Sequence, residues 1–160
     1  MKRGYGMECK MIYFARPIVG ITEKQKEQIR MVEAKCFDLI CGKNTIIYDP
    51  ANLRIPNAWN ISEEAWAQSV FTMDIHYLDK ARAMVLLDFG RGVGGGAYWE
   101  AGYACRHMPI VVVRMPDVKD SSLMVRCSAT QFFTYDEFLQ VKNVDFFADK
   151  INKGKACVLN

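Results

Sequence analysis

The sequence predicts an α/β fold with a doubly wound parallel sheet of five strands, and three observations lead to this prediction. Short apolar runs, such as those at 11–15 and 110–113, have the length of buried strands. These runs alternate along the chain with segments in which apolar residues recur at helical spacing. Parallel strands joined by helices need crossovers of one hand, which place helices on both faces of the sheet.

The predicted elements follow one another in a regular order. Strands are expected at 11–15, 45–48, 83–87, 110–113 and 131–134, and helices at 22–41, 62–80, 97–107 and 135–152. Thr22 and Ser62 suit the N-cap position, Gly42 ends the first helix, and the proline- and asparagine-rich residues 50–61 form a loop. This order defines a flavodoxin-like three-layer sandwich, in which ligands bind beyond the carboxyl ends of the strands.

Length and charge narrow the class of protein. The 160 residues suit one domain over 10–160, preceded by a loosely ordered tail over 1–9. The basic residues behind the net charge of +3 are scattered along the sequence. We therefore expect no basic patch suited to nucleic-acid binding. The apolar runs are too short for a membrane span.

The cysteines and histidines indicate the compartment and the cofactor content. Six cysteines permit three disulfides, but the N-terminus lacks the apolar core of a signal peptide. We therefore expect free thiols and a cytoplasmic location. No cysteine or histidine cluster has metal-ligand spacing, so we expect no metal and no other cofactor.

Asp74 interrupts the apolar stripe of the predicted helix 62–80. The stripe consists of Ala67, Val70, Phe71, Ile75 and Leu78. A carboxylate on a buried stripe is costly unless it is paired or lines a cavity. The position permits two interpretations: a structural aspartate that caps a loop or pairs with an arginine, or a functional carboxylate.

Glu100 is a second carboxylate in an unusual place. It follows the glycine-rich loop 90–96 and falls in the first turn predicted for helix 97–107, where the helix dipole favours an ionised carboxylate. Ala97, Ala101 and Ala104 would let this helix approach the sheet closely. An ionised, poorly hydrated carboxylate suits a nucleophile. Ordinary charge complementarity at a helix start explains the same pattern, so both interpretations stay open.

The glycine loop is not a nicotinamide-binding fingerprint. That fingerprint follows the first strand and needs an acidic residue about 20 residues further on, whereas this loop follows the third predicted strand. Its backbone N–H groups still offer donors to a phosphate or hydroxyl at the start of a helix.

Three segments carry a resemblance to a known family. Residues 96–104 (GAYWEAGYA) resemble the signature of the nucleoside 2-deoxyribosyltransferase family, which includes related deoxynucleoside 5′-monophosphate N-glycosidases. Residues 12–15 (IYFA) resemble the opening strand of the family, and 74–88 (DIHYLDKARAMVLLD) resemble its helix before the third strand. The three segments occur in the family's order and span most of 11–114.

The resemblance implies a reaction and roles for three residues. Glu100 matches the nucleophile that attacks the anomeric carbon, Asp74 the acid at the leaving nucleobase, and Tyr13 the residue that orients the nucleophile. The implied activity is cleavage of the N-glycosidic bond of a (2′-deoxy)nucleoside and transfer of the deoxyribosyl group to another nucleobase. It implies a nucleoside or nucleotide and a free nucleobase as partners, and a homodimer or larger oligomer with shared active sites.

Other positions bear on the substrate. Gly94 stands where the transferases carry an aspartate at the sugar's 5′ end, and Thr130, with Ser128 nearby, matches loosely a donor from the neighbouring subunit. The N-glycosidases have serines in both places, so hydrolysis of a nucleoside 5′-monophosphate to base and sugar 5-phosphate is an alternative. Further expected substrate contacts are Arg16, Asp88 and Gly96. A non-catalytic nucleotide-binding sensor is a second alternative, and a flavodoxin-like electron carrier a third.

Overall fold

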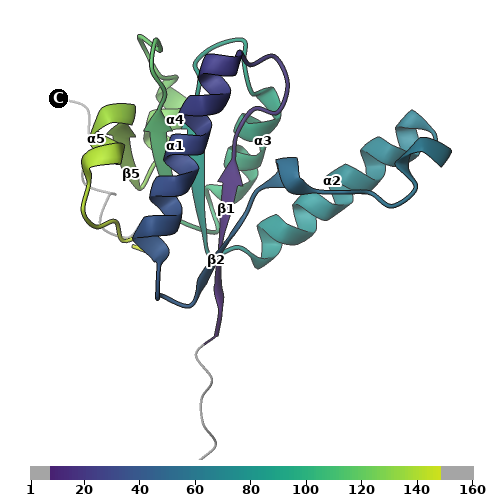
Figure 1. Cartoon of the computed structure of the whole chain (residues 1–160), viewed down its shortest axis with the longest axis horizontal. Helices are drawn as coiled ribbons and strands as arrows, with labels where there is room; N and C mark the ends of the chain where they lie inside the picture. Colours follow the sequence, from purple (N-terminus) through teal and green to yellow (C-terminus); the bar gives the residue numbers. More distant parts are fainter. Residues whose placement is uncertain (1–7, 149–160) are drawn as a thin grey trace, which may run out of the picture.

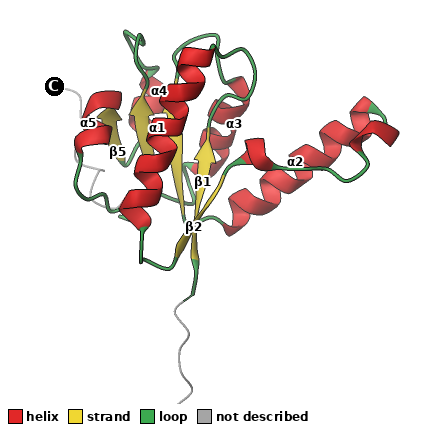
Figure 2. Cartoon of the chain, viewed as in Figure 1, coloured by secondary structure: helices red, strands yellow, loops and turns green. Residues whose placement is uncertain are grey.

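A computed structural model describes residues 8–148 and contains one sheet of five parallel strands. The strands are β1 (Lys10–Ala15), β2 (Thr45–Tyr48), β3 (Ala83–Asp88), β4 (Ile110–Arg114) and β5 (Gln131–Thr134). Their order across the sheet is β2-β1-β3-β4-β5, which is the flavodoxin-like order. Figure 2 shows the strands, in yellow, between the helices. The predicted fold class is therefore confirmed, and the order reverses between β1 and β3.

Helices cover both faces of the sheet (Figure 1). The side chains of α1 (Glu23–Ile40) and α5 (Tyr135–Gln140) pack on one face, and those of α2 (Glu63–Lys80), α3 (Gly95–Ala104) and α4 (Leu123–Ser128) pack on the other. Two short 3₁₀ helices, Pro50–Asn52 and Ala58–Asn60, lie in the connection between β2 and α2.

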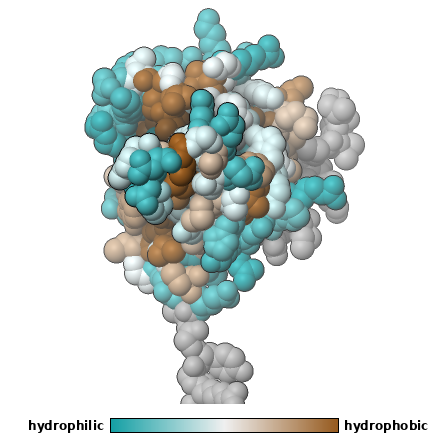
Figure 3. All heavy atoms as spheres, turned by 90° about the vertical axis from the view of Figure 1, so that its right-hand side faces the viewer, coloured by the Kyte–Doolittle hydropathy of each residue, from teal (hydrophilic) through white to brown (hydrophobic). Residues whose placement is uncertain are grey.

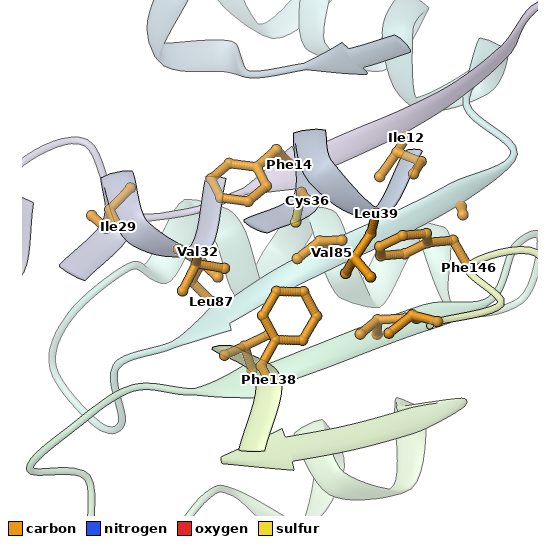
Figure 4. Packing of buried hydrophobic residues seen from close by; sticks show 14 of the residues in the cluster. Ile12, Phe14, Ile29, Val32, Cys36, Leu39, Val85, Leu87, Phe138 and Phe146 are labelled. Carbon is orange, nitrogen blue, oxygen red and sulfur yellow. The ribbon is translucent and has the colours of Figure 1, made fainter. Parts of the chain in front are cut away.

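Alternation along the strands divides the core into two layers. In β1, Ile12 and Phe14 face α1, whereas Tyr13 and Ala15 face α2 and α3. Figure 4 shows the first layer, in which side chains of α1, β1, β3 and α5 meet. The predicted helical stripe of α1 is buried there, and it consists of Ile29, Val32, Cys36 and Leu39.

The two N-cap residues expected from the sequence, Thr22 and Ser62, both form capping hydrogen bonds. The Thr22 side chain accepts from the Gln25 N–H, and the Gln25 side chain accepts in return from the Thr22 N–H. The Ser62 hydroxyl accepts from the Ala65 N–H at the start of α2. The boundaries of both helices therefore follow from local polar residues.

The C-terminal part of the chain departs from the prediction. The last helix ends at Gln140 and does not continue toward 152, although 149–152 lie outside the described residues. Val144 and Phe146 are buried in the same core layer as the side chains of α1. They are two residues apart in a segment that is not helical. The short helix α4 was not predicted, because it buries only Val125 and has no apolar stripe.

Helix α2 also differs from the prediction. Its apolar stripe was expected to face the core, yet Leu78 is its only buried residue, and Phe71 is 49% exposed. In Figure 1 the first half of α2 extends away from the sheet. Asp74 therefore does not lie on a core-facing stripe; it lies half-buried where α2 begins to approach the sheet.

Candidate active site

A tyrosine of the sheet holds the Glu100 carboxyl group. Tyr13 is fully buried, and its position in β1 directs it toward α2 and α3. Its hydroxyl donates a hydrogen bond of 2.9 Å to Glu100 Oε1 on α3. Ala97, Ala101 and Ala104 are buried against the same face of the sheet, so small residues do let α3 approach it closely.

A second tyrosine contacts the other carboxylate. Tyr48 ends β2 and pairs in register with Tyr13 of β1. The Tyr48 hydroxyl lies 3.4 Å from Asp74 Oδ1 and donates to it, while the Tyr48 ring stacks on Tyr77 of α2 with 3.8 Å between ring centroids. Two neighbouring strands thus each present a tyrosine to one carboxyl group.

The environment of Glu100 opposes its ionisation. Burial, with contributions from the negative charges of Asp74 and Asp49, raises the pKa of Glu100 to about 7, although the hydrogen bond from Tyr13 acts in the opposite direction. The helix dipole does not offset this. Because α3 begins at Gly95, Glu100 is its sixth residue and lies beyond the first turn, where the dipole acts. The expectation of a dipole-stabilised carboxylate was wrong.

The neighbouring groups have a similar electrostatic character. Burial raises the pKa of Asp74, and the hydrogen bond from Tyr48 partly lowers it. Burial and the charges of Glu100 and Asp74 raise the pKa of Tyr13 far above its ordinary value. Tyr13 therefore remains a hydrogen-bond donor at any physiological pH, and the carboxyl groups are the titrating members of the cluster.

Arg16 lies just beyond the end of β1 and forms an ion pair with Asp49. Its Nε donates to Asp49 Oδ2 at 2.9 Å, and the Asp49 side chain is almost fully buried. Asp49 also accepts from the Ala51 N–H. The Arg16 side chain is thus largely buried, with 18% of its surface exposed. The charge of Asp49 reaches Glu100, which places the Arg16–Asp49 pair in the neighbourhood of the carboxyl cluster.

Gly94 and Gly96 lie at the start of the helix that carries Glu100. Gly94 is the N-cap of α3 with φ of 79°, and a Cβ at this position would lie 3.4 Å from the Pro17 side chain. This conformation costs most side chains about 1–2 kcal/mol. Gly96 is exposed, with open space where a Cβ would stand. Both glycines keep the start of α3 free of side chains.

Asp88 and Ser128 lie elsewhere, in a cavity of about 630 Å³ between the glycine loop, α3 and α4. Its lining does not include Tyr13, Asp74 or Glu100. Asp88 Oδ1 accepts from the Gly90 N–H and the Tyr98 hydroxyl, so this carboxylate holds the glycine loop. The Ser128 hydroxyl donates to the Val125 carbonyl. The structure does not bring these two residues to the carboxyl cluster of the same chain.

Thr130 directly precedes β5 and lies at the amino-terminal end of the strands. The carboxyl ends of β1 and β3 lie at the other end of the sheet. Its hydroxyl accepts from the N–H of Ile110, the first residue of β4, and the side chain is buried. Within one chain it does not meet Glu100.

Sequence reasoning missed Tyr48 as a member of the site. The signal was available in part, because Tyr48 is the last residue of a predicted strand on the ligand side. What the sequence did not contain was the register of β1 and β2, which pairs Tyr48 with Tyr13. Trp59, in the connection between β2 and α2, and Trp66, in α2, are 82% and 43% exposed.

Metal-binding clusters and membrane-spanning helices are both absent from the described residues. Within residues 8–148, no three histidine, cysteine, aspartate or glutamate side chains gather closely enough to hold a metal ion. The five cysteines in this range carry free thiols. No helix among these residues has the length and apolar character needed to cross a membrane.

Solved structures share this fold, among them the following two. The first is a 2-deoxyribosyltransferase from Bacillus psychrosaccharolyticus, with a TM-score of 0.68 and 23% identity over 85% of this chain and 93% of that one. The second is a CMP N-glycosidase from Clostridium botulinum, with a TM-score of 0.52 and 14% identity over 82% of this chain and 96% of that one. No protein-family model matches the sequence, and no curated protein matches it. The family resemblance of the sequence is thus matched at the level of the fold.

Proposed function

We propose that this protein is an enzyme that cleaves the N-glycosidic bond of a (2′-deoxy)nucleoside and transfers the deoxyribosyl group to another nucleobase. One observation carries the proposal: the Tyr13 hydroxyl holds Glu100 at 2.9 Å beside a second carboxylate, Asp74. Paired carboxyl groups with separate roles are the requirement of retaining glycosyl chemistry. The two solved structures with this fold, a deoxyribosyltransferase and a nucleotide N-glycosidase, support the same chemistry.

The first step forms a glycosyl ester on Glu100. Its free carboxylate oxygen attacks C1′ of the sugar, and the bond between C1′ and the base nitrogen breaks. The electron pair of that bond leaves with the base, and the proton of Asp74 neutralises the departing nitrogen. Tyr13 keeps one Glu100 oxygen occupied, so the other oxygen faces the reaction.

The second step releases the sugar to an acceptor. A nitrogen of another nucleobase attacks C1′, the ester bond to Glu100 breaks, and the carboxylate is regenerated. The proton lost from the incoming nitrogen returns to Asp74. Water in place of the base would complete a hydrolysis by the same proton movements.

Gly94 favours a second candidate function, the hydrolysis of a nucleoside 5′-monophosphate to base and sugar 5-phosphate. An aspartate there would repel a phosphate, whereas the chain has glycines at both 94 and 96 and a free helix start. Backbone N–H groups at a helix start are good phosphate donors. The transferase remains our first proposal because the sequence pattern around Glu100 resembles it in most positions.

Substrate exchange distinguishes the two activities and also the sensor. The protein is incubated with deoxyinosine or with dCMP, each with and without adenine, and the products are separated by chromatography. We expect deoxyadenosine from deoxyinosine only when adenine is present. Release of cytosine and deoxyribose 5-phosphate from dCMP without adenine would instead establish the hydrolase. Turnover of neither substrate, together with binding of either one in calorimetry, would favour the sensor.

We also propose that the protein forms a homodimer or larger oligomer through the outer side of α2 and α3. Trp99 and Phe71 are each about half exposed, and their rings contact one another at 5.6 Å. Trp66 on the projecting part of α2 is 43% exposed. The face on this side of the molecule carries hydrophobic patches among hydrophilic residues (Figure 3). Exposed aromatic groups of this kind are typical of interfaces.

Light scattering after size-exclusion chromatography tests the oligomer. We expect a molar mass of at least twice the 18.3 kDa of one chain. Trp99→Glu should lower this mass toward that of a monomer, because it places a charge in the contact. Lys24→Glu, an exposed change on α1, serves as the control and should leave the mass unchanged. A wild-type protein that elutes as a monomer at high micromolar concentration would contradict the proposal.

A further inference from the structure

We propose that Tyr48 is a positioning residue for Asp74, in the same way that Tyr13 holds Glu100. The inference rests on the function proposed above and assigns a role that the family resemblance of the sequence did not supply. Its basis is geometric: two tyrosines in register on adjacent strands each reach a different carboxyl group.

The location of Tyr48 is fixed from three sides. Its backbone belongs to β2, where it pairs with Tyr13 of β1. Its ring lies 5.4 Å from the Tyr13 ring and is stacked on Tyr77 at 3.8 Å. A half-buried ring held by a strand and two neighbouring rings has few alternative rotamers, so the hydroxyl has a defined place beside Asp74.

The contact with Asp74 leaves one oxygen for chemistry. Tyr48 donates to Oδ1, so Oδ2 is the atom that holds the transferable proton. The distance of 3.4 Å is long for an O–H···O hydrogen bond. Contacts of this length in a ligand-free site commonly shorten when substrate excludes water. We therefore expect the bond to tighten when a base occupies the space beside Asp74.

The groups around Asp74 explain why a hydrogen-bond donor at this position affects its pKa. The groups that interact with Asp74 or share its site include Tyr48, Tyr13, Tyr77 and Glu100. The charge of Asp49 also reaches Glu100, and the Arg16 guanidinium is paired with Asp49. Burial raises the pKa of Asp74, and Tyr48 is the hydrogen-bond donor that opposes the rise. Removing the Tyr48 hydroxyl therefore removes a stabilising contact from the ionised form and raises the pKa further.

The test compares Tyr48→Phe with Tyr77→Phe. Both variants keep the stacked ring pair and lose one hydroxyl, but only Tyr48 donates to Asp74. The side-chain carboxyl carbon of Asp74, assigned with Asp74→Asn, is titrated by NMR. We expect Tyr48→Phe to move the Asp74 titration to higher pH, and Tyr77→Phe to leave it in place. Equal titrations in Tyr48→Phe and the wild type would overturn the proposal.

Kinetics supplies a second measurement that a purely structural role would not reproduce. We expect Tyr48→Phe to lower kcat roughly tenfold with little change in KM, because substrate binding is retained while proton delivery is misplaced. Its pH–rate profile should also move toward higher pH. A loss of activity with an unshifted profile would contradict the positioning role. Absence of turnover in the wild type would remove the proposed function, whereas the NMR titration would still decide whether Tyr48 holds Asp74.

Discussion

Replacing Glu100 with glutamine is expected to lower kcat/KM by at least roughly 10³-fold, because the amide cannot form the glycosyl ester. Glutamine keeps the size of the side chain and can still accept the hydrogen bond from Tyr13. The loss should therefore appear in the chemical step, without a matching loss of substrate binding. Initial rates with the substrate that the exchange experiment identifies, together with calorimetric binding, measure the two effects separately.

A matched control separates the nucleophile from the loss of a charge. Glu63 is exposed in the first turn of α2, away from the carboxyl cluster, and Glu63→Gln should retain wild-type rates. Acid quenching of the wild type during turnover, followed by intact mass spectrometry, should reveal a sugar adduct that maps to Glu100. Retention of more than a tenth of the activity in Glu100→Gln would exclude Glu100 as the nucleophile.

The same variant is expected to be more stable than the wild type above pH 7, by about 3 kcal/mol in the free energy of unfolding. Burial raises the pKa of Glu100 from 4.5 in its ordinary state to about 7 in the folded protein. Between these values the folded state binds more protons at Glu100 than the unfolded state does. The stability of the wild type therefore falls as pH rises from about 4.5 to 7, whereas glutamine has no such dependence.

Urea unfolding at pH 4.5, 6 and 8 tests this sign directly. The two proteins should differ by only a few tenths of a kcal/mol at pH 4.5, where Glu100 is protonated in the folded state and about half protonated in the unfolded state. The difference should grow to its full value by pH 8. Glu63→Gln again serves as the control and should shift the stability by only a few tenths of a kcal/mol at any pH. An equal stability of wild type and Glu100→Gln at pH 8 would mean that Glu100 is better solvated than its buried position implies.

Together, the two outcomes would describe a site in which stability is lowered for function. A carboxylate that is buried beside Asp74 and Asp49 is costly to ionise, yet only its ionised form is a nucleophile. A variant that gains stability while losing activity is the expected signature of such a residue.

The sheet and most of the element boundaries could be predicted from the sequence. Apolar runs and helical spacing act over a few residues, and so do the caps at Thr22 and Ser62, so these features can be read locally. Local patterns singled out Asp74 and Glu100, the family resemblance added Tyr13, and the structure brings these three together. Their catalytic roles remain predictions.

Properties that depend on segments far apart in the chain could be found only in the folded structure. The register of β1 and β2 pairs Tyr48 with Tyr13. Because α3 starts at Gly95, Glu100 lies beyond the first turn, where the helix dipole acts. Packing of α4 against α3 enclosed Asp88 in a separate cavity. Each of these results depends on burial and contacts summed over residues far apart in the chain. A local sequence pattern carries no information about such distant contacts. The pKa values of Glu100 and its neighbours therefore follow only from the folded structure.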